Sequence, residues 1–113
     1  MVPWPLLWHG ITSMKKPEDC QSMTELREAI DQLDQDLIAI IAKRFTYIDR
    51  AAELKLREGM PPRTTDRVQQ VVDQVRRLAA EAHLDPDLIE TLWRALIENA
   101  IEREARLMRH DHQ

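Results

Sequence analysis

A long stretch without proline or glycine, residues 22 to 58, constrains this chain more than any other feature. At its start, Ser22 and Glu25 match the S-x-x-E capping box, whose side chains satisfy free amide groups at a helix N-terminus. At its end come Gly59 and two consecutive prolines, Pro61 and Pro62, which prevent a helix from continuing. The sequence therefore predicts one helix of about 35 residues, roughly 50 Å long at 1.5 Å per residue.

A helix of that length is too long for this chain to cover by itself. With 113 residues, the chain can build one modest hydrophobic core but not two. The apolar residues of the helix recur every three or four positions, the spacing of a buried stripe: Leu26, Ile30, Leu33, Leu37 and Ile41. Because one small globule cannot bury the whole rod, we expect a partner chain to cover the rest of it.

Two further helices are predicted downstream. Thr65 is expected to cap the second helix, whose valines and leucines keep the three-to-four spacing. Asp85 and Pro86 are expected to open the third helix, as N-cap and first helical residue. The chain has only 2 glycines, and its abundant Ala, Leu, Ile, Glu and Arg favour helix. We predict an all-α fold with three helices per chain, one of them very long, as a single helical domain over residues 21–110.

The N-terminal segment, residues 1–20, is expected to be a flexible extension. Its apolar start is broken by prolines, lacks the basic region and cleavage site of a signal peptide, and is too short to span a membrane. Cys20 is the single cysteine, so an intrachain disulfide is excluded and no Cys/His spacing suits zinc. These features are typical of a protein of the reducing cytoplasm.

The charge balance argues against several classes of partner. The chain has 20 acidic and 16 basic residues, and its net charge of −4 provides no broad cationic field for nucleic acid or an anionic membrane. A helix-turn-helix DNA reader is disfavoured because the second and third helices are mixed in sign. The histidines show no ligand spacing, so we predict no metal site.

Two cations interrupt the apolar stripe of the long helix. Arg44 and Lys55 are about three turns apart, so they share a helix face at a separation of roughly 16 Å. Arg27 lies roughly 25 Å before Arg44 and reaches the same small ligand only from a symmetry-related chain. Arg67, after the Pro-Pro loop, and Glu104, on the stripe of the third helix, are further candidates. Such a set favours a compact dianion, since the planar fork of arginine binds a carboxylate bidentately.

A structural alternative stays open for these charges. Long Lys and Arg side chains often extend past apolar neighbours to reach water. Glu58 is close enough in sequence to pair with Lys55, and Asp49 and Glu53 flank Arg50. On this reading the chain is a non-catalytic helical dimerisation module.

Four segments, in their order and spacing, resemble the all-helical chorismate mutases (chorismate mutase type II), including their isochorismate pyruvate lyase branch. They are LREAIDQLD (26–34), AKRFTYIDRAAELK (42–55), TTDRV (64–68) and LWRALIENAIEREA (92–105). KPEDC (16–20) is similar to the lyase branch in particular. The resemblance implies an intertwined homodimeric helical bundle, in which both chains build each of two active sites and no cofactor takes part.

The resemblance also implies roles for particular residues. Arg27 of one chain and Arg44 of the other would bind the two carboxylates of the substrate. Lys55 would donate to the ether oxygen of the substrate, with Glu104 on the other side of that oxygen. The remaining implied substrate-binding residues are Arg67, Val68, Ala100 and Ile101.

The implied reaction is the rearrangement of chorismate to prephenate, a step toward aromatic amino acids in which no protein group becomes covalently attached. The protein would hold a compact conformer and place donors at the ether oxygen. The alternative is elimination of pyruvate from isochorismate, which gives salicylate. Val68 favours that branch, because typical mutases have there a glutamate that holds the substrate hydroxyl. Glu104 replaces a common glutamine and donates only when protonated, so we expect activity to rise on acidification.

Overall fold

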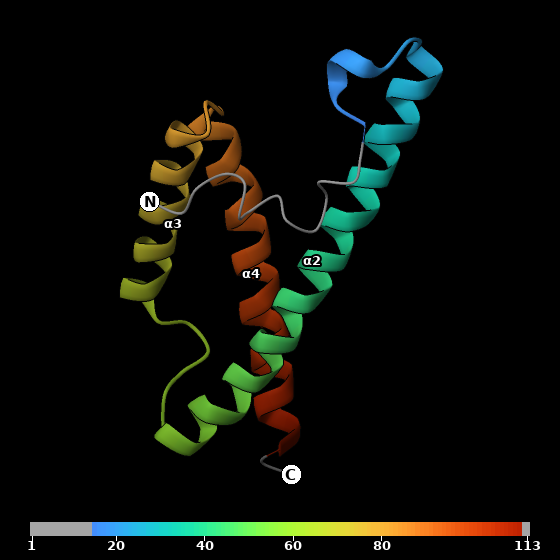
Figure 1. Ribbon diagram of the computed structural model, residues 1–113. Coiled ribbons are helices and arrows are strands. Elements are labelled where there is room, and N and C mark those ends of the chain that lie inside the picture. Colours follow the sequence, from blue (N-terminus) through green and yellow to red (C-terminus); the bar gives the residue numbers. More distant parts are fainter. Residues whose placement is uncertain (1–14, 112–113) are drawn as a thin grey trace. The chain divides into compact units, whose positions relative to one another are not determined.

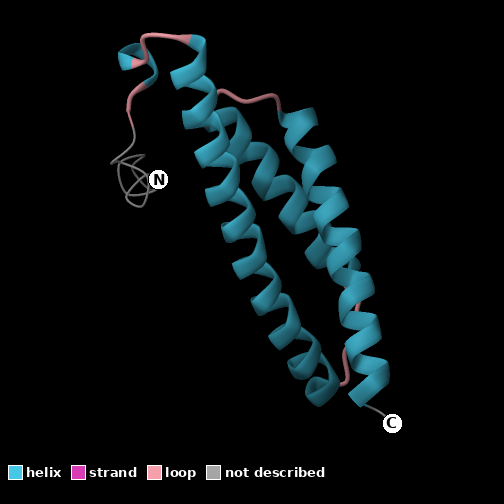
Figure 2. Ribbon diagram, turned by 90° about the vertical axis from the view of Figure 1, so that its right-hand side faces the viewer, coloured by secondary structure: helices cyan, strands magenta, loops and turns pink. Residues whose placement is uncertain are grey.

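The computed structural model describes residues 15–111, and all of its secondary structure in that range is helical (Figures 1 and 2). The elements are a short 3-10 helix, η1 (Pro17–Asp19), and three α-helices, α2 (Met23–Glu58), α3 (Thr65–Glu81) and α4 (Pro86–Asp111). The predicted all-α fold with one very long helix is confirmed. Most of the expected N-terminal extension, residues 1–14, lies outside the described residues.

The start of α2 is the predicted capping box. The backbone N–H of Glu25 donates to Ser22 Oγ at 3.2 Å. In return, the Glu25 carboxylate accepts from the N–H of Gln21 at 3.0 Å, one residue earlier than in the usual box. Lys15 Nζ pairs with the same carboxylate at 3.0 Å. The helix therefore begins where Ser22 and Glu25 together satisfy its free amide groups.

The end of α2 is a Schellman turn around Gly59. Gly59 has a positive φ of 69°, which glycine adopts without steric cost. Its N–H donates to the Leu56 carbonyl at 3.3 Å, and the Met60 N–H donates to the Lys55 carbonyl at 2.8 Å. The predicted stop at Gly59 is confirmed.

The other predicted helix starts differ in accuracy. Asp85 caps α4 as predicted, since its Oδ1 accepts from the Asp87 N–H at 2.9 Å, and Pro86 is the first helical residue. The expectation that Thr65 caps α3 is wrong by one residue. Thr65 is already helical, and the N-cap is Thr64, whose backbone is extended and whose side chain makes no capping hydrogen bond. Because Thr64 and Thr65 are adjacent and identical, the sequence alone does not distinguish which of them is the N-cap.

His83 ends α3 in a turn that the sequence did not predict. Its φ of 61° lies in the left-handed region, which is uncommon for a residue with a Cβ. The His83 N–H donates to the Ala80 carbonyl at 3.1 Å, and the Leu84 N–H donates to the Ala79 carbonyl at 2.8 Å. This is a second Schellman turn, with histidine where glycine is usual.

The chain separates within α2 into two compact units, the first ending at Ala42 and the second starting at Lys43. No described residue of the first unit is buried. Several large apolar side chains of its part of α2 are between 47% and 66% exposed, namely Met23, Ile30, Leu37, Ile38 and Ile40. Such an exposed apolar surface favours the expected second chain. The homodimer stays a prediction.

The second unit holds the core of the chain. In it, α3 and α4 pack side by side. The buried apolar residues come from all three helices: Ala52 of α2; Val72, Val75 and Ala79 of α3; and Ile97, Ala100 and Met108 of α4. Most of these side chains are small, so the helix backbones can approach closely.

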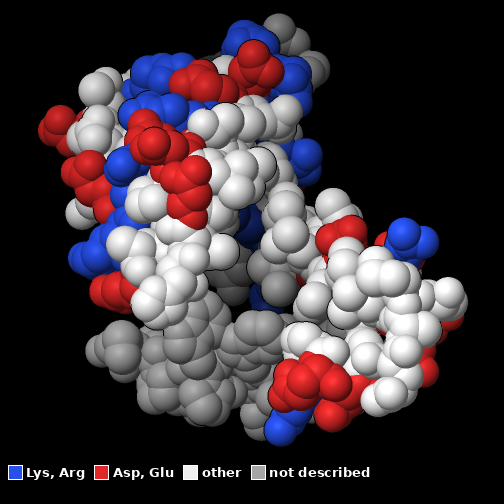
Figure 3. Space-filling model, turned by 90° about the horizontal axis from the view of Figure 1, so that it is seen from above, with Lys and Arg blue, Asp and Glu red and all other residues white. Residues whose placement is uncertain are grey.

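Several oppositely charged side chains pair on the described surface. Figure 3 shows Lys and Arg beside Asp and Glu on the face drawn there. Arg76 of α3 pairs with both Asp87 and Glu90 of α4, and these ion pairs join the two helices. Within residues 15–111, no helix contains an apolar run of the length and hydropathy that a membrane crossing requires.

Candidate active site

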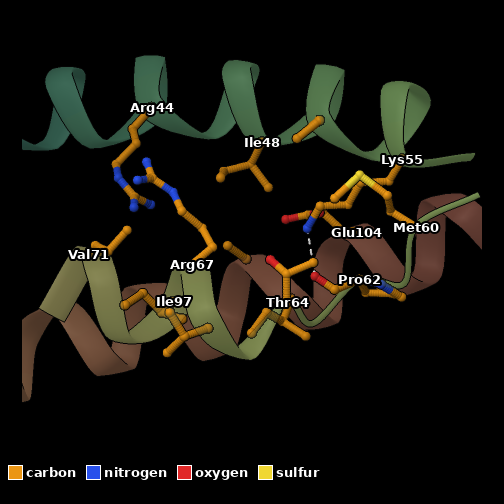
Figure 4. Close-up of a pocket in the computed structure, with 14 residues that line it drawn as sticks. Arg44, Ile48, Lys55, Met60, Pro62, Thr64, Arg67, Val71, Ile97 and Glu104 are labelled. Carbon is orange, nitrogen blue, oxygen red and sulfur yellow. Dashed lines mark hydrogen bonds and ion pairs between the residues drawn. The ribbon is translucent and has the colours of Figure 1, made fainter. Parts of the chain in front are cut away.

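A cavity of about 460 Å³ lies in the second unit, between α2, the loop after it, α3 and α4 (Figure 4). Seven of the eight predicted site residues line it: Arg44, Lys55, Arg67, Val68, Ala100, Ile101 and Glu104. These seven residues come from α2, α3 and α4.

Helical periodicity explains which side chains reach the cavity. On α2, Arg44, Ile48, Ala51 and Lys55 follow one another at intervals of four, three and four residues, so they share one face. On α4, the cavity face ends with Glu104, one turn beyond Ala100 and Ile101. The apolar members of these faces form the walls, and the charged members lie at the two ends.

One end of the cavity carries two arginines. The side chains of Arg44 and Arg67 point toward each other (Figure 4). Arg44 Nη1 is buried and has no hydrogen-bond partner among the described residues. Burial lowers the pKa of the Arg44 guanidinium, and the charge of Arg67 lowers it further. Because a buried charged donor without a partner is costly, this end of the cavity is suited to an anion.

The other end carries Lys55 and Glu104. Lys55 Nζ lies 2.6 Å from Glu104 Oε1, and the two side chains are 17% and 5% exposed. Lys55 Nζ also donates to the Pro62 carbonyl at 2.6 Å. The contact with Glu104 is an ion pair without the alignment of a hydrogen bond, so Oε1 accepts none from the described residues. An ammonium has three donors, so Lys55 keeps at least one for a further acceptor.

The sequence also allowed the charged residues of α2 to pair locally, with acidic residues of the same helix. The structure shows such local pairing at one position and not at another. Arg50 does pair locally, with Glu53 at 2.5 Å. Lys55, however, pairs with Glu104 of α4 rather than with Glu58. Lys55 on the apolar stripe of α2 therefore has an acidic partner, but that partner comes from α4.

Arg27 is the one predicted site residue that does not line the cavity. It lies in the first unit and is exposed. That Arg27 completes the site from a second chain stays a prediction.

Two polar groups of the cavity were missed by sequence reasoning. The first is the Pro62 carbonyl, a backbone atom that leaves no signal in the sequence. The second is Thr64, whose side chain makes no capping hydrogen bond and lines the cavity. Its place in TTDRV, three residues before Arg67, is the signal that could have identified it. In the described range 15–111, no group of three or more His, Cys, Asp or Glu residues could hold a metal ion.

The fold and the site together define an all-helical protein with a small cavity that has arginines at one end and a lysine–glutamate pair at the other. A family profile described as chorismate mutase type II matches residues 26–105. The chain therefore belongs to the chorismate mutase type II family, and the family predicted from the sequence is confirmed.

Similar proteins carry the names of both branches of this family. The isochorismate pyruvate lyase of Pseudomonas aeruginosa is 34% identical over 84 residues, which cover 74% of this chain and 82% of that protein. The chorismate mutase of Methanocaldococcus jannaschii is 28% identical over 79 residues, covering 70% of this chain and 80% of that protein. The bifunctional chorismate mutase/prephenate dehydratase of Escherichia coli is 31% identical over 86 residues, which are 22% of its length.

Proposed function

We propose that this protein is a chorismate mutase, which rearranges chorismate to prephenate in the cavity between α2, α3 and α4. One observation supports this most directly: Arg44 Nη1 is buried without a hydrogen-bond partner in the described part of the chain, and the Arg44 side chain faces Arg67 at the far end of the cavity from Lys55. A small dicarboxylate ether would satisfy both ends of the cavity at once.

The proposed mechanism uses binding and electrostatics. One carboxylate binds at Arg44 and Arg67, which removes the cost of leaving Arg44 Nη1 unpaired. The apolar walls hold the enolpyruvyl group folded over the ring. As the ether C–O bond breaks and the new C–C bond forms, negative charge grows on the ether oxygen, and Lys55 donates a hydrogen bond to it. No atom of the protein becomes covalently attached to the substrate.

A second activity, isochorismate pyruvate lyase, is favoured by Val68. In this reaction the ether C–O bond breaks while a ring hydrogen moves to the enolpyruvyl methylene, and the products are pyruvate and salicylate. The wall of the cavity at Val68 is apolar, so it offers the chorismate ring hydroxyl no partner. The similar Pseudomonas aeruginosa protein carries the lyase name. We therefore propose that one cavity supports both reactions.

The deciding experiment is an assay with each substrate separately, at about pH 5 and about pH 8. Prephenate and salicylate are quantified for the parent, for Arg44→Ala, and for Arg77→Ala as the control. Arg77 is an exposed arginine of α3 outside the cavity. We expect turnover of at least one substrate by the parent and the control, with a loss of 100-fold or more, about 3 kcal/mol, in Arg44→Ala. A folded parent that turns over neither substrate would support the dimerisation module instead.

We further propose that the active form is a homodimer with shared sites, in which Arg27 of one chain completes the cavity of the other. Arg27→Ala and Arg44→Ala are each expected to be inactive. If they are unfolded and refolded together, half of the dimers are mixed, and one of the two sites in each mixed dimer has both arginines. The mixture is then expected to recover about a quarter of the parent activity. No recovery would mean that both arginines serve the same site from one chain.

A further inference from the structure

Outside the cavity, a second ion pair joins the two helices that carry Lys55 and Glu104. Arg103 of α4 binds Asp49 of α2 bidentately, with Nη2 to Oδ2 at 2.9 Å and Nε to Oδ1 at 2.5 Å. The Arg103 guanidinium also lies over the ring of Phe45, 5.6 Å from its centre. Neither Asp49 nor Arg103 lines the cavity.

This pair and the Lys55–Glu104 pair attach α4 to α2 at two points. Along α2, Asp49 and Lys55 are separated by about 9 Å. On α4, Arg103 and Glu104 are consecutive, so their side chains leave the helix about 100° apart. Because α4 also packs along α3, a single ion pair would fix one point of α2 against α4 and let the two helices turn or slide relative to each other about that point. Two points, separated along one helix and around the other, prevent both movements.

We propose that Asp49 and Arg103 are positioning residues, which fix the rotation of α4 against α2 and so hold the Glu104 carboxylate at Lys55. This inference rests on the proposed function, because it assigns the pair to the geometry of that site. The required precision is high. A side-chain end about 6 Å from the helix axis moves by about 1 Å when the helix turns by about 10°. A displacement of about 1 Å in a catalytic group can lower a rate by about 100-fold.

The Asp49–Arg103 pair is partly exposed, so its effect on the site can be distinguished from an effect on the stability of the fold. The side chains of Arg103 and Asp49 are 43% and 37% exposed. Exposed ion pairs add little to the free energy of unfolding, because water screens them. Losing the pair is therefore expected to change the site more than the stability of the fold.

The test compares the parent with Asp49→Asn, with the charge-swapped double variant Asp49→Arg, Arg103→Asp, and with Val75→Ala. Val75 is buried in the core but lies outside the cavity, so its variant loses stability without touching the site. Two quantities are measured. One is the nuclear Overhauser contact between the side-chain methylenes of Lys55 and Glu104, and the other is kcat and KM for the substrate that the parent converts.

We expect Asp49→Asn to weaken the Lys55–Glu104 contact and to lower kcat at least tenfold, with a smaller change in KM. The charge-swapped variant restores the contact and most of kcat. Val75→Ala lowers Tm and leaves kcat of the folded protein unchanged. The inference is overturned if Asp49→Asn keeps the contact and the parent kcat, or if the swap restores neither. A parent without activity would refute the proposed function, whereas the contact measurement would still decide the positioning role.

Discussion

Replacing Glu104 by glutamine is expected to destabilise the free protein and to strengthen its binding of an anion. Glu104 is 4% exposed and is the only carboxylate paired with Lys55 among the described residues. Removing one partner of a fully buried ion pair costs about 3–5 kcal/mol. Lys55 is partly exposed and keeps the Pro62 carbonyl, so we expect a cost just below this range, about 2–3 kcal/mol. For a domain of this size, that lowers Tm by roughly 10 °C.

The gain in anion binding has the same electrostatic origin. A pair of charges at about 4 Å interacts by about 4 kcal/mol at an effective dielectric constant of about 20. If the bound substrate dianion recovers a third to a half of this from Lys55, Glu104→Gln binds the substrate about tenfold more tightly. The acid dependence expected from the sequence is attributed to this carboxylate. The glutamine variant is uncharged throughout, and its activity is expected to stay nearly constant with pH.

The assay combines thermal unfolding, with and without substrate, and a pH–rate profile. Glu98→Gln is the matched control, because Glu98 is an exposed carboxylate of α4 paired with Arg63. The variant at Glu104 should show a lower Tm without substrate and a larger rise in Tm with substrate than either the parent or the control. A Glu104→Gln profile with the same acid dependence as the parent, or with weaker anion binding, would refute this reasoning.

Three further predictions concern single positions. Val68→Glu supplies a partner for the chorismate hydroxyl in the cavity wall, and should raise the ratio of prephenate to salicylate formation about tenfold, measured with each substrate separately. The hydrogen bond from Arg103 lowers the pKa of Asp49, so its contribution to stability is present above about pH 4 and is lost as the pH falls further. The Tm difference between the parent and Asp49→Asn should therefore shrink below about pH 4; a difference that grows there would contradict the assignment. His83→Gly relieves a left-handed φ and should raise the free energy of unfolding by about 0.5–1 kcal/mol in urea titration, whereas His83→Ala should not.

The sequence by itself determined the helices and the faces of their side chains. The limits of α2 follow from Ser22, Glu25 and Gly59, because capping and termination depend on residues within one turn of the helix end. The shared face of Arg44 and Lys55 follows from helical periodicity alone. Local signals were weaker where two residues present the same chemistry, as at the two threonines before α3. They failed at His83, whose left-handed turn is closed by hydrogen bonds to the carbonyl groups of the preceding helix.

Only the tertiary structure decided which charges meet. Lys55 pairs with Glu104 and Asp49 with Arg103, although acidic and basic residues closer in sequence were available. The Pro62 carbonyl at Lys55 has no counterpart in the amino-acid sequence. These contacts depend on how α2 and α4 are rotated against each other, which brings together residues that are about 50 positions apart in the sequence. Helical periodicity within one helix predicts on which face a charged residue lies. It does not predict which residue of another helix will contact that charge.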